Sequence, residues 1–283
     1  MNEKEMNALI RLLDDSDNEI FSLVRERLVS LGKPAIPFLE NTWGRSFDAM
    51  LQGRIETIIH QIQFHSLQEE LAAWKREGTH DLLKGALLIA KYQYPDLDEE
   101  KVRLQLEQIR KDVWLELNDS LTALEIVRVM NHIIFDVHGF SGNTANYHAP
   151  QNSYINIVLE SKKGNPLSLA IIYCIVSHNL ELPIFGINLP EHFILAYREG
   201  AAAPEKGEIL FYINAFSRGT VFHRKEIDQF LKQLNLAQEK SFYEPCSNLD
   251  MVQRLARNLI NSYQKLGYVD KVSELEILLG TLL

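Results

Sequence analysis

The stretch that decides the fold reads Lys162-Lys163-Gly164-Asn165-Pro166-Leu167-Ser168-Leu169-Ala170-Ile171-Ile172-Tyr173-Cys174-Ile175-Val176. Asn165 is a good helix N-cap, and Pro166 suits the first helical position, where its missing N–H would have no intrahelical partner. Nearly every residue at 167–176 is apolar or small, so this helix has no wet face. The sequence therefore predicts a helix that starts at Asn165, ends before Pro183 and is buried on most sides.

Three apolar runs after this helix predict strands. They are Ile184 to Ile187, Phe193 to Tyr197 and Ile209 to Ile213, with a hairpin-like segment of Gly, Ala, Pro, Glu and Lys residues at 200–206 before the last run. We therefore predict an α+β fold, mostly helical, in which the buried helix packs on a small antiparallel sheet and helical hairpins flank this core.

Helical periodicity dominates on both sides of the core. Helices are predicted before it at 5–13, 19–31, 35–43, 50–64, 66–75, 81–92, 97–117 and 121–137, and after it at 225–234, 249–266 and 270–282. The start of the protein resembles one HEAT-type repeat, and the last helix pair resembles a tetratricopeptide unit. We predict three regions: a HEAT-like helical region at 1–80, the core at 81–225 and a tetratricopeptide-like tail at 226–283.

The composition is that of an ordinary globular protein. Of the 283 residues, 46% are hydrophobic and 24% are charged. The net charge of −9, from 29 basic and 38 acidic residues, gives no reason to expect nucleic acid or an anionic membrane as a partner. The polar start at 1–5 lacks the apolar region of a signal peptide, and no run approaches the ~18 apolar residues of a membrane span. We therefore expect a cytoplasmic protein.

The usual metal and cofactor motifs are missing from the sequence. Its two cysteines, Cys174 and Cys246, are too few for a disulfide framework or a four-ligand zinc site, and they form no CxxC pair. No two histidines are four residues apart, as they are in a zinc-binding helix, and there is no glycine-rich phosphate-binding motif. We predict neither a metal nor a cofactor.

The start of the buried helix is a suitable place for nucleophilic chemistry. Its free N–H groups and the positive end of the helix dipole would favour a thiolate. A histidine on the next strand and a carboxylate or amide on the strand after would complete a Cys/His/Asp-type relay. His192 and Asn214 occupy these two positions, but the helix start has no thiol. A lone histidine at the start of a strand is also commonly structural.

Five motifs carry a resemblance to a known family. They are Asn152-Ser153-Tyr154-Ile155 with Val158-Leu159-Glu160, Gly164-Asn165-Pro166-Leu167-Ser168-Leu169-Ala170, Leu182-Pro183, Asn188-Leu189-Pro190-Glu191-His192-Phe193, and Ile213-Asn214-Ala215-Phe216. Over residues 85–283 they resemble the transglutaminase-like superfamily, and more closely its bacterial SirB-type branch. That branch combines a transglutaminase-like, papain-like core with a tetratricopeptide-like tail.

The resemblance implies roles for three positions. Family members that catalyse acyl transfer or peptide hydrolysis carry Gly-x-Cys at the helix start. The spacing from that cysteine to the proline of a following Gly-Ile-Pro is similar to the spacing between Pro166 and Pro183. Pro166 therefore stands where the nucleophile would be. His192 matches the family histidine, and Asn214 falls where the family usually has Asp.

Other nucleophiles fit the relay less well. Cys174 lies about 12 Å further along the helix at ~1.5 Å per residue, and it suits the role of a small core residue. Ser168 is nearer, but a serine in the first helical turn more often caps backbone groups. Cys246 precedes a helix outside the core, and no base is placed beside it.

We favour a non-catalytic transglutaminase-like protein that binds a ligand or a protein partner, the partner being recruited by the helical flanks. Its candidate pocket combines residues of the relay with the long polar loop at 141–153: Asn165, Ser168, His192, Asn214, Tyr147 and Asn152. Such loops are often functional, although this one could also be a structural crossover. One alternative is a hydrolase or acyltransferase using Ser168, or a water activated by His192 and oriented by Asn214. Another is a helical adaptor with a vestigial pocket. The sequence does not identify the ligand, the partner or the oligomeric state.

Overall fold

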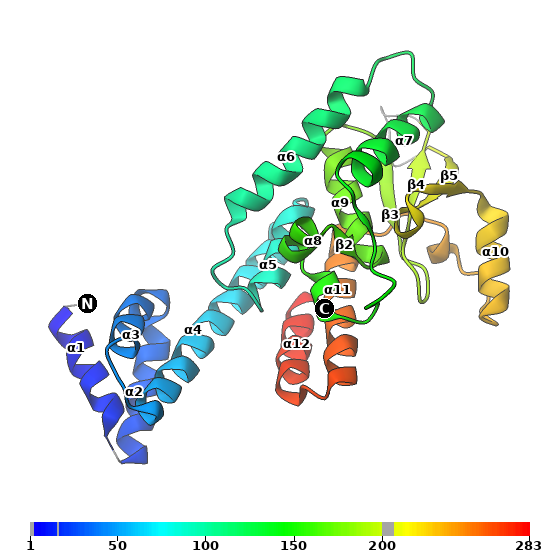
Figure 1. Ribbon diagram of the computed structural model, residues 1–283. Helices are drawn as coiled ribbons and strands as arrows, with labels where there is room; N and C mark the ends of the chain where they lie inside the picture. Colours follow the sequence, from blue (N-terminus) through cyan, green and yellow to red (C-terminus); the bar gives the residue numbers. More distant parts are fainter. Residues whose placement is uncertain (1–2, 16, 200–206) are drawn as a thin grey trace. The chain divides into compact units, whose positions relative to one another are not determined.

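The fold is α+β and mostly helical, as predicted (Figure 1). The computed structural model describes residues 3–15, 17–199 and 207–283. The predicted hairpin-like segment at 200–206 and the first two residues of the polar start lie outside the described residues. The protein divides into two compact units, Met1–Ala73 and Trp74–Leu283. The finer division into regions at 1–80, 81–225 and 226–283 stays a prediction.

The first unit contains helices α1 (Glu3–Arg11), α2 (Asn18–Leu31), α3 (Ile36–Trp43) and most of α4 (Ala49–Arg76). The Asp17 carboxylate begins α2 by accepting a hydrogen bond from the Glu19 N–H at 2.8 Å. Apolar residues at helical spacing meet in one core, which includes Met6, Leu13, Val24, Leu28, Leu39, Ile55 and Ile58. Burial of these side chains holds the first unit together.

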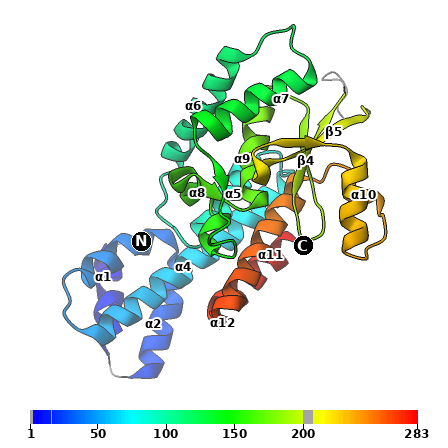
Figure 2. The same ribbon diagram turned by 45° about the vertical axis from the view of Figure 1, so that its right-hand side comes forward.

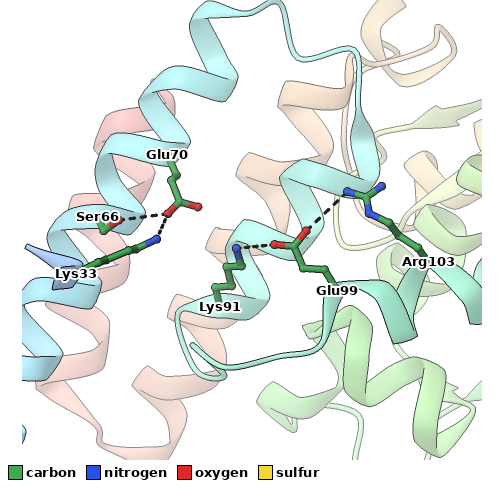
Figure 3. Close-up of polar contacts among 6 residues, drawn as sticks. All are labelled: Lys33, Ser66, Glu70, Lys91, Glu99 and Arg103. Carbon is green, nitrogen blue, oxygen red and sulfur yellow. Dashed lines mark hydrogen bonds and ion pairs between the residues drawn. The ribbon is translucent and has the colours of Figure 1, made fainter. Parts of the chain in front are cut away.

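Helix α4 is continuous where two helices were predicted, at 50–64 and 66–75. The Ser66 hydroxyl does not cap a new helix: it donates a hydrogen bond at 3.2 Å to Glu70, one turn later. The ammonium group of Lys33 lies 2.6 Å from the same carboxylate (Figure 3). The predicted break at 64–66 is therefore wrong, because a serine side chain can be satisfied inside a helix and no glycine or proline lies at 54–75.

The second unit begins with α5 (Leu82–Lys91), α6 (Glu99–Glu116) and α7 (Ala123–Asn131). Three side chains cap these helices: Asp81, Asp98 and Thr122. Glu99 at the start of α6 pairs with Lys91 of α5 at 2.6 Å and with Arg103 at 3.7 Å (Figure 3). The single helix predicted at 121–137 changes pitch, because α7 continues as the π-helical segment η3 (His132–Val137).

Two short helices follow the long loop, α8 (Ile155–Ser161) and α9 (Pro166–His178). The predicted central helix is α9, and every residue at 166–177 is buried, as its apolar composition requires. A parallel pair that the sequence did not predict, β1 (Ser141–Gly142) with β2 (Lys163–Gly164), joins the start of the loop to the residues before α9. This pair holds the loop beside the start of the central helix.

The main sheet has four antiparallel strands in sequence order: β3 (Ile184–Ile187), β4 (Ile194–Arg198), β5 (Ile209–Asn214) and β6 (Thr220–Phe222). The three predicted strands are confirmed. Ile187 lies opposite Ile194, and Leu195 lies opposite Ile213. This register brings the residues just before β4 to the end of the sheet at which β5 ends.

Helices cover both faces of this sheet (Figure 2). Ile194 and Ala196 of β4 join a buried cluster with Ile227 and Leu231 of α10 (Arg224–Gln233). Side chains alternate along a strand, so the residues between them face the other side, where β3 and β4 pack against α9. The sheet therefore lies between α9 and α10.

A helical hairpin, α11 (Asn248–Leu266) and α12 (Val269–Leu282), ends the second unit. Helix α11 also packs against α5 and α9. A Cβ atom added to Gly85 of α5 would lie 2.7 Å from the Val252 side chain, so the two helices approach closely where the glycine has no side chain. Helix α11 thereby forms part of the wall around the start of α9. None of the described helices combines the length and the apolar character needed to cross a membrane.

Candidate functional site

A cavity of about 510 Å³ opens at the N-terminal end of α9. Four segments of the second unit line it: the loop at 147–149, the helix start at 165–167, the turn at 191–193 before β4, and one face of α11. Pro166 and His192, which the sequence analysis paired, both line this cavity. Asn165 and Tyr147 line it as well.

The start of α9 is held by a reciprocal capping box between Asn165 and Ser168. The Asn165 side-chain oxygen accepts from the Ser168 N–H at 2.9 Å, and the Ser168 hydroxyl oxygen accepts from the Asn165 N–H at 3.0 Å. The Asn165 amide group also donates to the Ser153 hydroxyl at 2.9 Å. Ser168 is buried and does not line the cavity. Its hydroxyl is engaged in stabilising the helix start.

His192 is half-buried just before β4, and its ring centroid lies 6.3 Å from that of Phe230. Burial lowers the pKa of His192. A side-chain hydrogen bond with Asn214 opposes this shift, and the positive charge of Arg254 adds to it. The net effect favours a neutral imidazole at neutral pH.

Asn214 is the last residue of β5; its side chain lies near enough to His192 to affect the pKa of the imidazole, and it does not line the cavity. Its amide oxygen also accepts from the Ser217 N–H at 3.2 Å, which begins a short 3₁₀ turn. The two relay residues expected from the sequence are thus adjacent. The role of the amide in orienting the histidine stays a prediction.

Asn152 holds the long loop and is not part of the cavity lining. Its buried side chain donates to the carbonyl oxygens of Asn146 at 2.7 Å and Tyr147 at 3.0 Å, and it accepts from Asn143 at 2.8 Å. The Tyr147 ring packs edge-on against Phe216, with centroids 5.7 Å apart. Asn152 therefore positions the loop, and Tyr147 is among the loop residues that reach the cavity.

One wall that sequence reasoning missed comes from α11. Its polar side chains recur at helical spacing along the cavity: Arg254, Asn258, Asn261, Ser262 and Lys265. The Arg254 guanidinium donates to the Asn188 side-chain oxygen and to the Leu189 carbonyl oxygen, the latter at 2.6 Å, so it links α11 to the turn that carries His192. The spacing of these polar residues can be read from the sequence. Their position in the cavity wall depends on the packing of α11 beside α9, which the sequence does not show.

Neither cysteine lies in the cavity lining. Cys174 is fully buried within α9, and burial raises the pKa of its thiol far above the ordinary value. Burial and the nearby Asp250 raise the pKa of Cys246 to about 12. Both thiols are therefore poor nucleophiles at neutral pH. Within the described ranges, no cluster of three or more His, Cys, Asp or Glu residues could hold a metal ion.

Comparison with known proteins identifies relatives of this region. Residues 100–257 match the transglutaminase-like superfamily. A UPF0162 protein of Xylella fastidiosa (strain Temecula1) is 38% identical over 134 residues, which is 44% of this protein and 46% of the relative. A UPF0162 protein of Vibrio cholerae is 27% identical over 137 residues, or 48% of each protein. Human F-box only protein 21 is 27% identical over 144 residues, which is 50% of this protein and 22% of the relative.

The chain spans about half the length of the bacterial relatives it matches. No solved structure matches it. The match at 100–257 covers more than half of the sequence and includes the start of α9, His192, Asn214 and the first half of α11. On that match, the chain belongs to the transglutaminase-like superfamily.

Proposed function

We propose that this protein is a non-catalytic member of its superfamily, whose cavity binds a ligand or a segment of a protein partner. The observation that carries the proposal is Pro166, which lines the cavity together with His192 at the position expected for a nucleophile. Proline has neither a thiol nor a hydroxyl. The nearest alternative, Ser168, has its hydroxyl engaged in the helix cap. An oriented imidazole therefore faces a cavity wall without a side-chain nucleophile at the helix start.

The helical parts support a protein partner. Helical repeats of the HEAT and tetratricopeptide types bind partners through extended surfaces, and both flanks of the core resemble such units. The tail resembles that of the SirB-type branch, and α11 of this tail contributes one wall of the cavity. A partner held by the tail would therefore lie close to the cavity. We place this activity in the cytoplasm.

Restoring the nucleophile tests the proposal. In Pro166→Cys, the new thiol would lie at a helix start and line the same cavity as His192; the helix dipole stabilises a thiolate there, and the neutral imidazole is available to accept the proton of the thiol. We expect iodoacetamide at neutral pH to alkylate position 166 about tenfold faster than Cys174 or Cys246, whose thiols are protonated. Mass spectrometry of peptides from the alkylated protein would locate the label.

The control is Pro166→Cys combined with His192→Ala, in which the rate at position 166 should fall towards that of an ordinary exposed thiol. Equal alkylation rates in the two variants would show that His192 does not affect the reactivity of a thiol at position 166. Turnover of peptide or acyl substrates by the wild-type protein, abolished in His192→Ala, would overturn the non-catalytic proposal directly.

A second candidate function rests on the hydrogen bond between His192 and Asn214. A neutral imidazole held by an amide is suited to act as a general base towards water, which would make the protein a hydrolase without a side-chain nucleophile. This candidate predicts slow ester or peptide hydrolysis that is lost in both His192→Ala and Asn214→Ala. Ser168→Ala should leave that rate unchanged.

A further inference from the structure

Arg254 is a half-buried cation on the cavity wall. Its hydrogen bonds go to neutral acceptors, the side-chain oxygen of Asn188 and the carbonyl oxygen of Leu189. Across residues 3–15, 17–199 and 207–283, no carboxylate forms an ion pair with it. Burial lowers the pKa of Arg254; the nearby Cys246 and Tyr147 oppose this shift, and Arg257 adds to it. A partly desolvated charge without a counter-charge is unfavourable, so an anion in the cavity would be stabilised there.

Lys265 lies at the other end of the same helix face and differs in its surroundings. It is exposed, and its ammonium group lies 3.2 Å from a ring nitrogen of His148. Water already solvates this charge. The attraction between two opposite charges is several times stronger at the lower effective dielectric constant of a partly buried site than in bulk water. Arg254 is therefore the stronger of the two sites for an anion.

The side chains between these two cations are amides. Asn258 and Asn261 follow Arg254 by about 6 Å and ~10 Å along the helix axis, from the ~1.5 Å rise per residue. An extended peptide advances ~3.3 Å per residue, so these distances correspond to about two and three peptide residues. Neither amide makes a hydrogen bond within the part of the protein that the structure describes. Both can therefore donate to, and accept from, a peptide backbone.

On the basis of the proposed function, we propose that the cavity binds a short extended peptide segment whose carboxylate pairs with Arg254 and whose backbone bonds to Asn258 and Asn261. The carboxylate belongs either to the free C-terminus of the peptide or to an Asp or Glu side chain. The charge of the lining favours this monoanion over a phosphate dianion. Arg254 and Lys265 contribute two positive charges and the exposed Glu191 one negative charge, which leaves a net +1.

Four series of fluorescent decapeptides, titrated into the full-length protein, test this inference. The first series has free C-termini, and the second has the same sequences with C-terminal amides. The third is amidated but carries internal Asp or Glu, and the fourth replaces those acids by Asn or Gln. We expect a carboxylate to increase affinity about tenfold over its matched amide, the value of one charge-assisted pair. The first and third series identify which carboxylate is preferred.

Variants assign the preference to Arg254. Arg254→Gln should abolish the advantage of the carboxylate peptides, and Arg254→Lys should keep part of it. The matched control is Arg257→Gln, because Arg257 is exposed on the same helix and lies outside the cavity lining. This control should bind like the wild type. Thermal unfolding of each variant separates lost binding from a loosened turn at Asn188.

The outcomes distinguish this inference from the proposed function. Peptides that bind equally well as acids and amides, and lose affinity in Asn258→Ala, would overturn the carboxylate inference and leave a binding cavity in place. A carboxylate preference that is lost as completely in Arg257→Gln as in Arg254→Gln would reduce the charge effect to general electrostatics and would also overturn the inference. Absence of binding in all four series would overturn the inference, while the reactivity of Pro166→Cys would still decide the non-catalytic proposal.

Discussion

At the scale of single residues, the main feature of the site is that the helix start, which lines the same cavity as His192, has no side-chain nucleophile. Asn214 lies near the His192 ring and the ring lines a polar cavity, but Pro166, which lines the same cavity, has no thiol or hydroxyl for the imidazole to activate. The buried Ser168 cannot take over this role without leaving the cap of α9, which would release the Asn165 N–H group. Loss of such a cap typically costs about 1 kcal/mol.

The lowered pKa of His192 predicts how stability depends on pH. Its pKa in the folded protein lies below the unfolded value of ~6.5, so the unfolded protein binds the proton more readily. The stability contributed by the neutral imidazole is complete above about pH 6.5 and is lost as the pH falls below it. Urea unfolding at about pH 7.5 and pH 5.5 should show a smaller loss of stability on acidification for His192→Gln than for the wild type.

The exposed His80 provides the control for this measurement. His80→Gln should follow the wild type at both pH values. Equal losses for the wild type, His192→Gln and His80→Gln would show that burial of His192 does not contribute to acid sensitivity.

Sequence reasoning identified some of these residues and missed others for a physical reason. Asn165 and Pro166 are recognisable because capping and the first helical position select particular residue types. His192 was found through its place in a motif. Arg254 was not found, because its role depends on packing between α11 and the turn at 188–189, which local sequence does not encode. The assignments of pocket residues from sequence alone remain predictions.

At the scale of elements, the turn after β5 anchors the π-helical segment to the sheet. The Asn131 amide donates to the Gly219 carbonyl oxygen at 2.8 Å, and its side-chain oxygen accepts from the Tyr173 hydroxyl at 3.2 Å. Arg218 of the same turn forms an ion pair with Asp136 of η3. The turn therefore joins η3, α9 and the end of β5, where Asn214 lies near His192.

Two glycines with the same backbone conformation allow this anchor to be tested. Gly219 and Gly139 both have φ of +74°, but a Cβ atom would lie 1.9 Å from the Asn131 side-chain oxygen at Gly219 and would meet nothing within 4 Å at Gly139. Gly139→Ala should cost only the backbone strain, about 1 kcal/mol. Gly219→Ala should cost about 3 kcal/mol, because it also displaces Asn131 from its hydrogen bonds.

Urea unfolding of both variants checks this difference. Equal losses would mean that Asn131 moves aside without cost, and the anchor would then contribute little to stability. A larger loss for Gly219→Ala should be accompanied by faster amide exchange in η3 (His132–Val137).

Elements with a strong local pattern were predicted well, and those that depend on distant partners were not. The apolar residues of α9 and of the three strands at 184–213 follow recognisable patterns, and capping or turn residues mark the ends of these elements. The β1–β2 pair consists of two residues on each side and exists because the loop returns to the start of α9. The change of pitch at His132 and the continuity of α4 through Ser66 likewise leave no local signal.

At the scale of the whole molecule, each compact unit has apolar packing of its own. A buried cluster of the first unit is drawn from residues 6–62, and α9 is the centre of the second. We therefore expect the two units to respond separately to damage. Leu28→Ala removes a fully buried side chain from the first unit and should destabilise it by ~2–5 kcal/mol.

Hydrogen exchange followed by mass spectrometry would locate this effect. In Leu28→Ala, exchange should accelerate in the described residues before 74 and stay unchanged in α9 and the sheet. The matched variant Leu169→Ala, in which an equally buried leucine of α9 is shortened, should show the reverse pattern. Acceleration throughout the protein in either variant would mean that the two units unfold as one.

The walls of the cavity are contributed by residues 147 to 265, and this span has a consequence for synthesis on the ribosome. When the strands emerge, α11 has not yet left the ribosome, so the side of α5 at Gly85 and the turn at Asn188 are uncovered. The nascent polypeptide passes through a stage in which the His192 imidazole is present but the cavity wall that α11 contributes is missing. The site therefore becomes competent late in translation, and nascent polypeptides that stall before α11 would display the histidine while lacking the guanidinium that we expect to recognise a ligand.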